Sequence, residues 1–198
     1  MRRRFRSAAG AAMSVAVAGG VLLATALPAG AEGGDNAFAV QDVNGYYGLG
    51  PLGRVTDYSW PYVSSGISLP GLLSTGMIVD RATPTLASAQ LGSVVLHLNS
   101  RVTIRLAGLS GWCRVSPGND VYGGATLGSG SVLQIGGTTI PLPVNPAPDT
   151  IITFAGGGEI DLNAQTSDPG DIQVFGAEIF PGNGEQIQLA QAYCDSFR

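Results

Sequence analysis

The stretch that decides the fold is VVLHLNSRVTIRL, residues 94–106. Its apolar residues fall on every second position and share one face of an extended strand: Leu96, Leu98, Val102, Ile104 and Leu106. The polar residues share the opposite face: His97, Asn99, Arg101, Thr103 and Arg105. The alternation predicts one long strand with a buried face and a solvent-exposed face.

The same period of two recurs along the chain, and no segment after residue 31 sustains apolar residues at helical spacing. Further strands are expected at residues 37–47, 62–69, 76–80, 85–91, 131–142, 150–154, 159–164, 172–180 and 186–193. With 30 Gly and 12 Pro available for turns, this spacing predicts an all-β domain. A β-sandwich is the first expectation and a β-barrel the second.

Two glycine positions predict local features of these strands. Gly136 and Gly137 lie between two apolar strand segments and predict a two-residue hairpin turn, because both can adopt a positive φ. Gly176 interrupts the alternation between residues 172 and 179 and predicts a β-bulge.

The N-terminal residues 1–31 have the pattern of a helical secretory signal peptide that is removed by cleavage. Arginines at positions 2, 3, 4 and 6 precede a charge-free apolar segment at residues 8–27, and Ala29-Gly30-Ala31 forms a small-residue cleavage site. The run Arg2-Arg3-Arg4-Phe5 leaves twin-arginine export open beside the general secretory route. Either route predicts a protein outside the cell, secreted into the medium or loosely associated with the cell surface.

The exported part is expected to hold a flexible N-terminus and first strand at residues 32–44, followed by a single β-sandwich domain at residues 45–198. It keeps six arginines against 14 acidic residues, so its net charge is −8. This balance argues against nucleic acid and, after cleavage, against an anionic membrane as partner, since both need clustered cations. The oligomeric state cannot be read from these features.

Cys113 and Cys194 are the two cysteines of the chain. An even number of cysteines in an exported protein predicts that they form a disulfide with each other.

Tyr58, Trp60 and Tyr62 alternate and would line one face of an extended segment. Such a row is a platform on which sugar rings can stack, which makes extracellular or cell-wall polysaccharide the expected partner. Pro61 confines the segment to an edge strand, where its missing donor is not needed. Packing of the same rings into the core is the alternative, because buried aromatics dominate β-cores.

Glu159, Asp161 and Asn163 also alternate onto one strand face, with Asp168 and Asp171 in the turn that follows. Paired carboxylates can act as the acid and base of a glycosidase, and an oxygen-rich patch can hold calcium. A solvated strand face explains the same residues. We predict no catalytic residue, metal or cofactor, since His97 is the single imidazole and no G-x-S-x-G motif accompanies it. The G-x-G-x-x-G match at residues 48–53 precedes no helical pattern and predicts a glycine-rich turn.

From about Gly45 onward the chain resembles the choice-of-anchor P family of exported bacterial proteins. The residues that carry the resemblance are Pro146-Ala147-Pro148-Asp149-Thr150, the glycines at 156–158, Leu162-Asn163-Ala164-Gln165 and Ala190-Gln191-Ala192-Tyr193-Cys194. The resemblance implies a β-rich extracellular domain of high-GC Gram-positive bacteria. It brings no active-site motif with it.

Together these features predict a secreted, non-catalytic β-sandwich that acts outside the cell or at its surface. A carbohydrate- or cell-wall-binding module and a glycoside hydrolase that uses Glu159 or Asp161 are the alternatives.

We predict that the exported protein begins at Glu32, because the small residues Ala29 and Ala31 direct cleavage after position 31. Intact-mass measurement of protein from the culture medium tests this. Recovery of the uncut 198-residue chain in the membrane fraction alone would contradict it.

Overall fold

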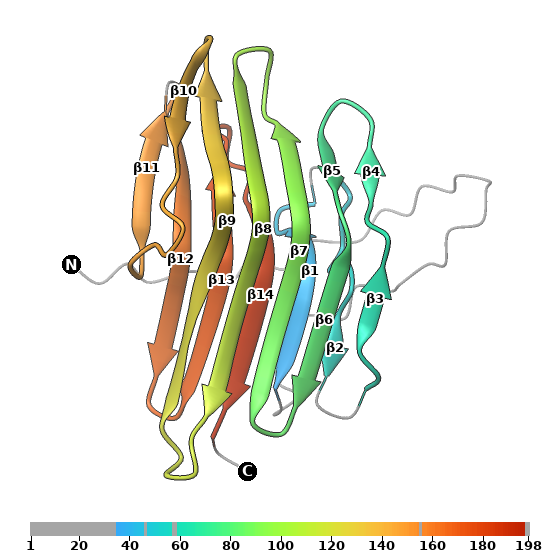
Figure 1. Cartoon of the computed structure of the whole chain (residues 1–198), viewed down its shortest axis with the longest axis vertical. Coiled ribbons are helices and arrows are strands. Elements are labelled where there is room, and N and C mark those ends of the chain that lie inside the picture. Colours follow the sequence, from blue (N-terminus) through green and yellow to red (C-terminus); the bar gives the residue numbers. More distant parts are fainter. Residues whose placement is uncertain (1–34, 46, 57–58, 155, 197–198) are drawn as a thin grey trace.

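The computed structural model describes residues 35–45, 47–56, 59–154 and 156–196, and the predicted signal peptide and Tyr58 lie outside these ranges. Every regular element in the described residues is a strand, and the strands form two antiparallel sheets (Figure 1). The sheets pack face to face and are not closed into a barrel, so the prediction of a β-sandwich is confirmed.

The six-stranded sheet has the order β11-β12-β13-β14-β1-β2. Its strands are β11 (Thr150–Phe154), β12 (Gly158–Asp168), β13 (Asp171–Phe180), β14 (Ile187–Asp195), β1 (Asn36–Asp42) and β2 (Val55–Thr56). The first strand of the chain therefore pairs with the last one, which places both ends of the domain in the middle of one sheet.

The eight-stranded sheet contains the middle of the chain. Along its main path lie β10 (Thr138–Pro141), β9 (Val121–Ile135), β8 (Val102–Val115), β7 (Leu86–His97), β5 (Leu73–Thr75) and β4 (Ser68–Leu69). The first half of β7, Leu86–Leu91, pairs with β6 (Ile78–Thr83), whereas its second half pairs with β5. Strand β6 pairs in turn with β3 (Tyr62–Ser64). The predicted hairpin turn at Gly136 and Gly137, with φ of 54° and 91°, joins β9 to β10 and is confirmed.

Residues 94–106 are not one strand, so that prediction is wrong. They form the hairpin between β7 and β8, in which Leu96 lies opposite Ile104. The turn is fixed by Asn99, whose side-chain oxygen accepts hydrogen bonds from the backbone amides of Arg101 and Val102 at 2.8 and 3.0 Å. Residues opposite each other in a hairpin share a face, so the alternation continues through the turn and conceals it.

In the six-stranded sheet, the alternation of inward and outward side chains is interrupted along one row that crosses the strands. At this row the four neighbouring strands β1, β14, β13 and β12 each turn two consecutive residues toward the other sheet: Ala39 and Val40, Leu189 and Ala190, Gly176 and Ala177, Leu162 and Asn163. Asn163 and Ala190 adopt positive φ values of 56° and 53° there. The register of β13 with both neighbours stays constant, so the bulge predicted at Gly176 is wrong. The alternation is interrupted at Gly176 because the strand turns its other face inward there, and the neighbouring strands do the same at the same row.

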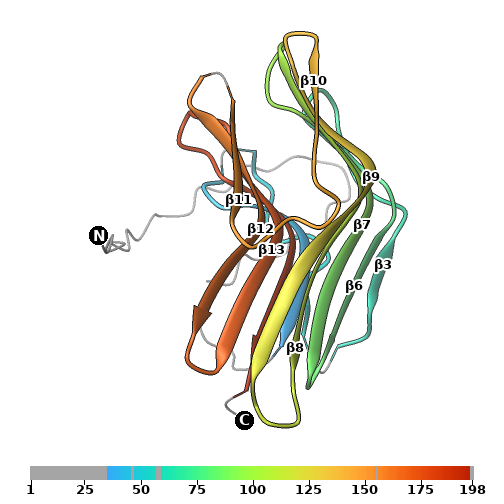
Figure 2. The same ribbon diagram turned by 60° about the vertical axis from the view of Figure 1, so that its left-hand side comes forward.

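The two sheets approach most closely at this row, where side chains are small. A methyl group on Gly111 of β8 would overlap the carbonyl oxygen of Ala190 in β14 and lie 3.2 Å from the amide nitrogen of Gly176. The backbones of the two sheets are therefore in direct contact. Away from this contact the sheets diverge toward the end that carries β10 and β11 (Figure 2).

The predicted disulfide is confirmed and lies beside this contact. Cys113 of β8 and Cys194 of β14 are bonded, with 5.9 Å between their Cα atoms and a sequence separation of 81. Both residues are fully buried. In the chain-entropy model a loop of this length stabilises the fold by about 4.5 kcal/mol.

Replacing Gly111 with Ala is expected to destabilise the protein by about 3 kcal/mol, because the atom in its way is backbone and cannot rotate aside. Gly118→Ala, in the turn between β8 and β9, is the matched control, since its nearest neighbour would be 3.6 Å away. Equilibrium urea unfolding measures both variants. Equal stability of the two would show that the sheets are not held backbone to backbone.

Candidate functional site

The structure describes two of the three aromatic residues that the sequence grouped together, Trp60 and Tyr62, and both are exposed. Trp60 is 92% exposed and precedes the edge strand β3. Tyr62 begins β3 and packs next to Gly53 and Asp80, where its ring would meet any side chain at position 53. Of the described pair, Trp60 alone presents its ring fully to solvent, and its role in sugar binding stays a prediction.

A second aromatic platform lies on the outer face of the eight-stranded sheet. Cys113 faces the core, so its neighbour Trp112 faces outward. Gly124 lies opposite Trp112 on β9, and its absent side chain leaves the indole ring 3.6 Å from the position a Cβ would take. Tyr122, 44% exposed, meets Trp112 edge to face, with 6.0 Å between ring centroids. The two rings therefore hold each other in place.

Polar side chains lie beside this platform on the same face. Ser88 is opposite Trp112, and the next row contains Gln90, Ser110 and Thr126. The hydroxyl groups of Ser110 and Thr126 are 2.9 Å apart and share a hydrogen bond. Together they offer both donors and acceptors to the hydroxyl groups of a ligand.

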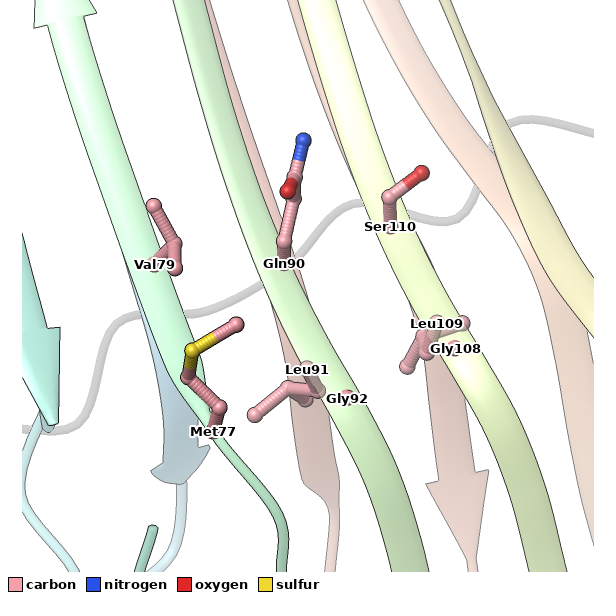
Figure 3. Close-up of a pocket in the computed structure, with 8 residues that line it drawn as sticks. All are labelled: Met77, Val79, Gln90, Leu91, Gly92, Gly108, Leu109 and Ser110. Atoms are coloured by element: carbon pink, nitrogen blue, oxygen red, sulfur yellow. The ribbon is translucent and has the colours of Figure 1, made fainter. Parts of the chain in front are cut away.

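The row continues into a shallow depression with a volume of about 280 Å³. Figure 3 shows Val79, Gln90 and Ser110 projecting from three neighbouring strands, with Met77 beside them. Gly92 and Gly108 form part of the lining. Aromatic rings, a hydrogen-bonding row and a shallow depression on one face are the components of a sugar-binding surface.

The outer face of the six-stranded sheet carries the acidic residues that the sequence singled out. Asp161 of β12 lies directly opposite Glu178 of β13. Glu178 accepts hydrogen bonds from the amide groups of Gln186 and Gln188 at 2.7 and 2.8 Å. Asn163 does not share this face, because the change of face turns it inward, where it donates to the carbonyl oxygen of Pro146.

Burial and, to a smaller extent, the negative charges of Asp149, Glu178 and Glu159 together raise the pKa of Asp161 to about 6. Burial also raises the pKa of Glu178, although its two amide donors oppose the shift. The pair lies on an open sheet face, whereas the depression described above lies on the other sheet. Asp168 and Asp171 close the β12–β13 turn, where the Asp171 carboxylate accepts from the amide of Asp168 at 3.3 Å.

In the described part of the chain, no group of three or more His, Cys, Asp or Glu residues could hold a metal ion. The exposed His97 contacts the hydroxyl of Thr103 at 3.1 Å.

A further carboxyl group is buried between the sheets. Asp80 of β6 is fully inaccessible, and neither of its oxygens accepts a hydrogen bond of good geometry. Burial raises its pKa to about 7, and the backbone amide of Gln90 opposes this shift weakly. Gly53 covers the group so closely that a Cβ atom there would collide with the carboxylate.

Comparisons with known proteins found no matching family model, no curated relative and no similar solved structure. Among the described residues there is no helix of the length and apolar character that crossing a membrane requires.

The stability of the protein is expected to fall as the pH rises from about 4 to about 7. In this window folded Asp80 keeps a proton that it releases on unfolding, since its pKa is about 7 when folded and 3.8 otherwise. The slope attributable to Asp80 is up to about 1.4 kcal/mol per pH unit. Asp80→Asn should remove this pH dependence and be more stable than the wild type above about pH 7.

Asp120→Asn, in an exposed turn, is the control. Urea unfolding across this range tests the prediction, and parallel profiles for wild type and Asp80→Asn would contradict it.

Proposed function

We propose that the protein is a secreted, non-catalytic β-sandwich that binds carbohydrate outside the cell, in the medium or at the cell surface. The N-terminal pattern of residues 1–31 supports export. The disulfide between Cys113 and Cys194 is compatible with an oxidising environment.

The observation that carries the proposal is the platform of Trp112 and Tyr122. Both rings stand on neighbouring strands in the interior of a sheet, and Gly124 lies directly opposite Trp112, where the indole ring covers it. Residues on such strands are held more precisely than residues on loops. Trp60 lies outside a strand, so we place the binding function on Trp112 and Tyr122 first and on Trp60 second.

The resemblance to the choice-of-anchor P family is part of this proposal. The residues that carry it contact one another: the side chain of Asn163 donates to Pro146 at 3.0 Å, and the Asp149 carboxylate accepts from the amide of Gln165 at 2.8 Å. Two of the similar segments thus form one hydrogen-bonded unit that fixes the start of β11 to β12. This is a structural role, and it agrees with a family signature that carries no catalytic motif.

Glycoside hydrolysis is the second candidate, because Asp161 and Glu178 are direct neighbours and the pKa of Asp161 is raised. Residues opposite each other in a sheet have Cβ atoms about 5 Å apart, near the separation that a retaining glycosidase uses. The open face around the pair offers no enclosure for a sugar ring, so binding on the other sheet is the better-supported function.

Trp112→Ala is expected to weaken polysaccharide binding about tenfold and to change the melting temperature little, because the ring is partly exposed. Affinity electrophoresis through gels that contain plant and bacterial polysaccharides measures the effect. Trp60→Ala is the matched control and should bind like the wild type.

Each contrary outcome has a defined meaning. Loss of binding in Trp60→Ala alone would move the site to the edge strand. Hydrolysis of the polysaccharide by the wild type, abolished in Asp161→Asn, would replace binding by catalysis. No retention of the wild type in any gel would end the carbohydrate proposal.

A further inference from the structure

The charges of this protein are sorted by sheet. The described strands of the six-stranded sheet contain no Arg, Lys or His and carry these carboxylates: Asp42, Glu159, Asp161, Asp168, Asp171, Glu178 and Asp195. The strands of the eight-stranded sheet contain one carboxylate, Asp80, and that group is buried between the sheets. The same strands carry Arg81, Arg105, Arg114 and His97, all exposed.

The three arginines lie on the outer face of the eight-stranded sheet. Arg81 lies between the buried residues Asp80 and Ala82, and Arg105 between Ile104 and Leu106, so both arginines point away from the core. Arg114 follows the buried Cys113 and is likewise directed outward. Arg101 adds a fourth exposed cation in the turn between β7 and β8.

Two of the arginines flank the aromatic platform. Arg114 is directly opposite Tyr122, and Arg81 lies in the same row as Ser88 and Trp112. No carboxylate of the described strands lies on this face to neutralise them. The strand residues of this face therefore carry arginines and no carboxylate around the aromatic rings, and the exposed Asp120 follows in the β8–β9 turn.

We propose that the carbohydrate bound by this face is anionic, a polysaccharide whose sugars carry carboxylate or phosphate groups. The proposal rests on the function proposed above and names the class of ligand. Arginine binds both groups well, because its planar guanidinium can donate two parallel hydrogen bonds to them. The acidic opposite sheet repels such a polymer and so favours its approach to the arginine side.

The spacing of the cations favours a polysaccharide over nucleic acid. Arg105 and Arg114 are nine residues apart on one strand, or about 30 Å. Duplex DNA presents one charge per about 1.7 Å of its axis and is bound by dense clusters of cations. An acidic polysaccharide has a lower charge density than DNA, so single arginines can each bind one of its charged groups, while its rings and hydroxyl groups meet Trp112, Ser110 and Gln90 between the arginines.

The test compares the purified protein's affinity for polygalacturonate with that for its methyl ester, which is the same polymer without charge. Polygalacturonate is expected to bind more tightly, and raising the salt from about 50 to about 200 mM should remove the difference. The double variant Arg81→Gln/Arg114→Gln should bind polygalacturonate about fivefold more weakly and bind the ester unchanged. Arg54→Gln, an exposed arginine outside the eight-stranded sheet, is the matched control. A phosphate-bearing mannan in place of polygalacturonate shows which anion is preferred, and a preference for either supports the proposal.

Other outcomes would refute either the anionic ligand alone or carbohydrate binding as a whole. Equal affinity for acid and ester, insensitive to the arginine variants, would refute an anionic ligand and leave carbohydrate binding intact. Absence of binding to every polysaccharide would refute both. If duplex DNA bound as tightly as polygalacturonate, and still bound to Trp112→Ala, the face would attract polyanions in general. That result would refute a polysaccharide ligand. Thermal unfolding of each variant confirms its fold, and Arg114→Gln alone replaces the double variant if that one is unstable.

Discussion

The contact between the backbone of Gly111 and the backbones of Ala190 and Gly176 is the constraint on which the rest of the structure depends. Two sheets that touch without side chains between them cannot both keep a regular alternation and fill the spaces on either side. The six-stranded sheet meets this requirement by turning two consecutive residues inward on four neighbouring strands along one row. Leu109, Val174 and the disulfide are among the buried residues near this contact, and they belong to one continuous core.

The contact between the sheets also holds the candidate binding face in place. Trp112 lies between Gly111, which touches the opposite sheet, and Cys113, which is covalently joined to it. Both flanking residues are fixed from behind, so the strand under the indole has little freedom to move. The acidic outer face of the six-stranded sheet is built differently: Glu178 is held by two glutamine side chains, and its neighbour Asp161 has a buried oxygen with no hydrogen bond.

Much of this could be predicted from the sequence, because strand periodicity, turn chemistry and cysteine pairing are local or nearly local signals. The all-β class, the Gly136–Gly137 turn and the pairing of Cys113 with Cys194 follow from them. The hairpin at residues 94–106 was missed because opposite residues share a face, so period-two alternation survives the turn. The Asn99 turn signal could have revealed it. The row at Gly176 was misread as a bulge because the same interruption recurs in neighbouring strands, which one strand alone cannot show.

The site was harder to predict than the fold. Trp112 and Tyr122 are ten positions apart and become neighbours only through the pairing of β8 with β9. The inward direction of Cys113 was the signal that could have placed Trp112 outside. Net charge also misled, since an overall excess of carboxylates conceals a face from which they are excluded.

The covalent bond between β8 and the last strand gives the fold a mechanical property. The disulfide closes a loop between Cys113 and Cys194, whose sequence separation is 81, so tension applied near the C-terminal end passes through the sulfur atoms directly into β8. Strands β9 to β13 lie inside that loop, so the covalent path of the load bypasses them. The loop withholds about 270 Å of contour length from extension. A protein tethered by this end would hold the Trp112 surface in shape under shear as long as the bond stays oxidised.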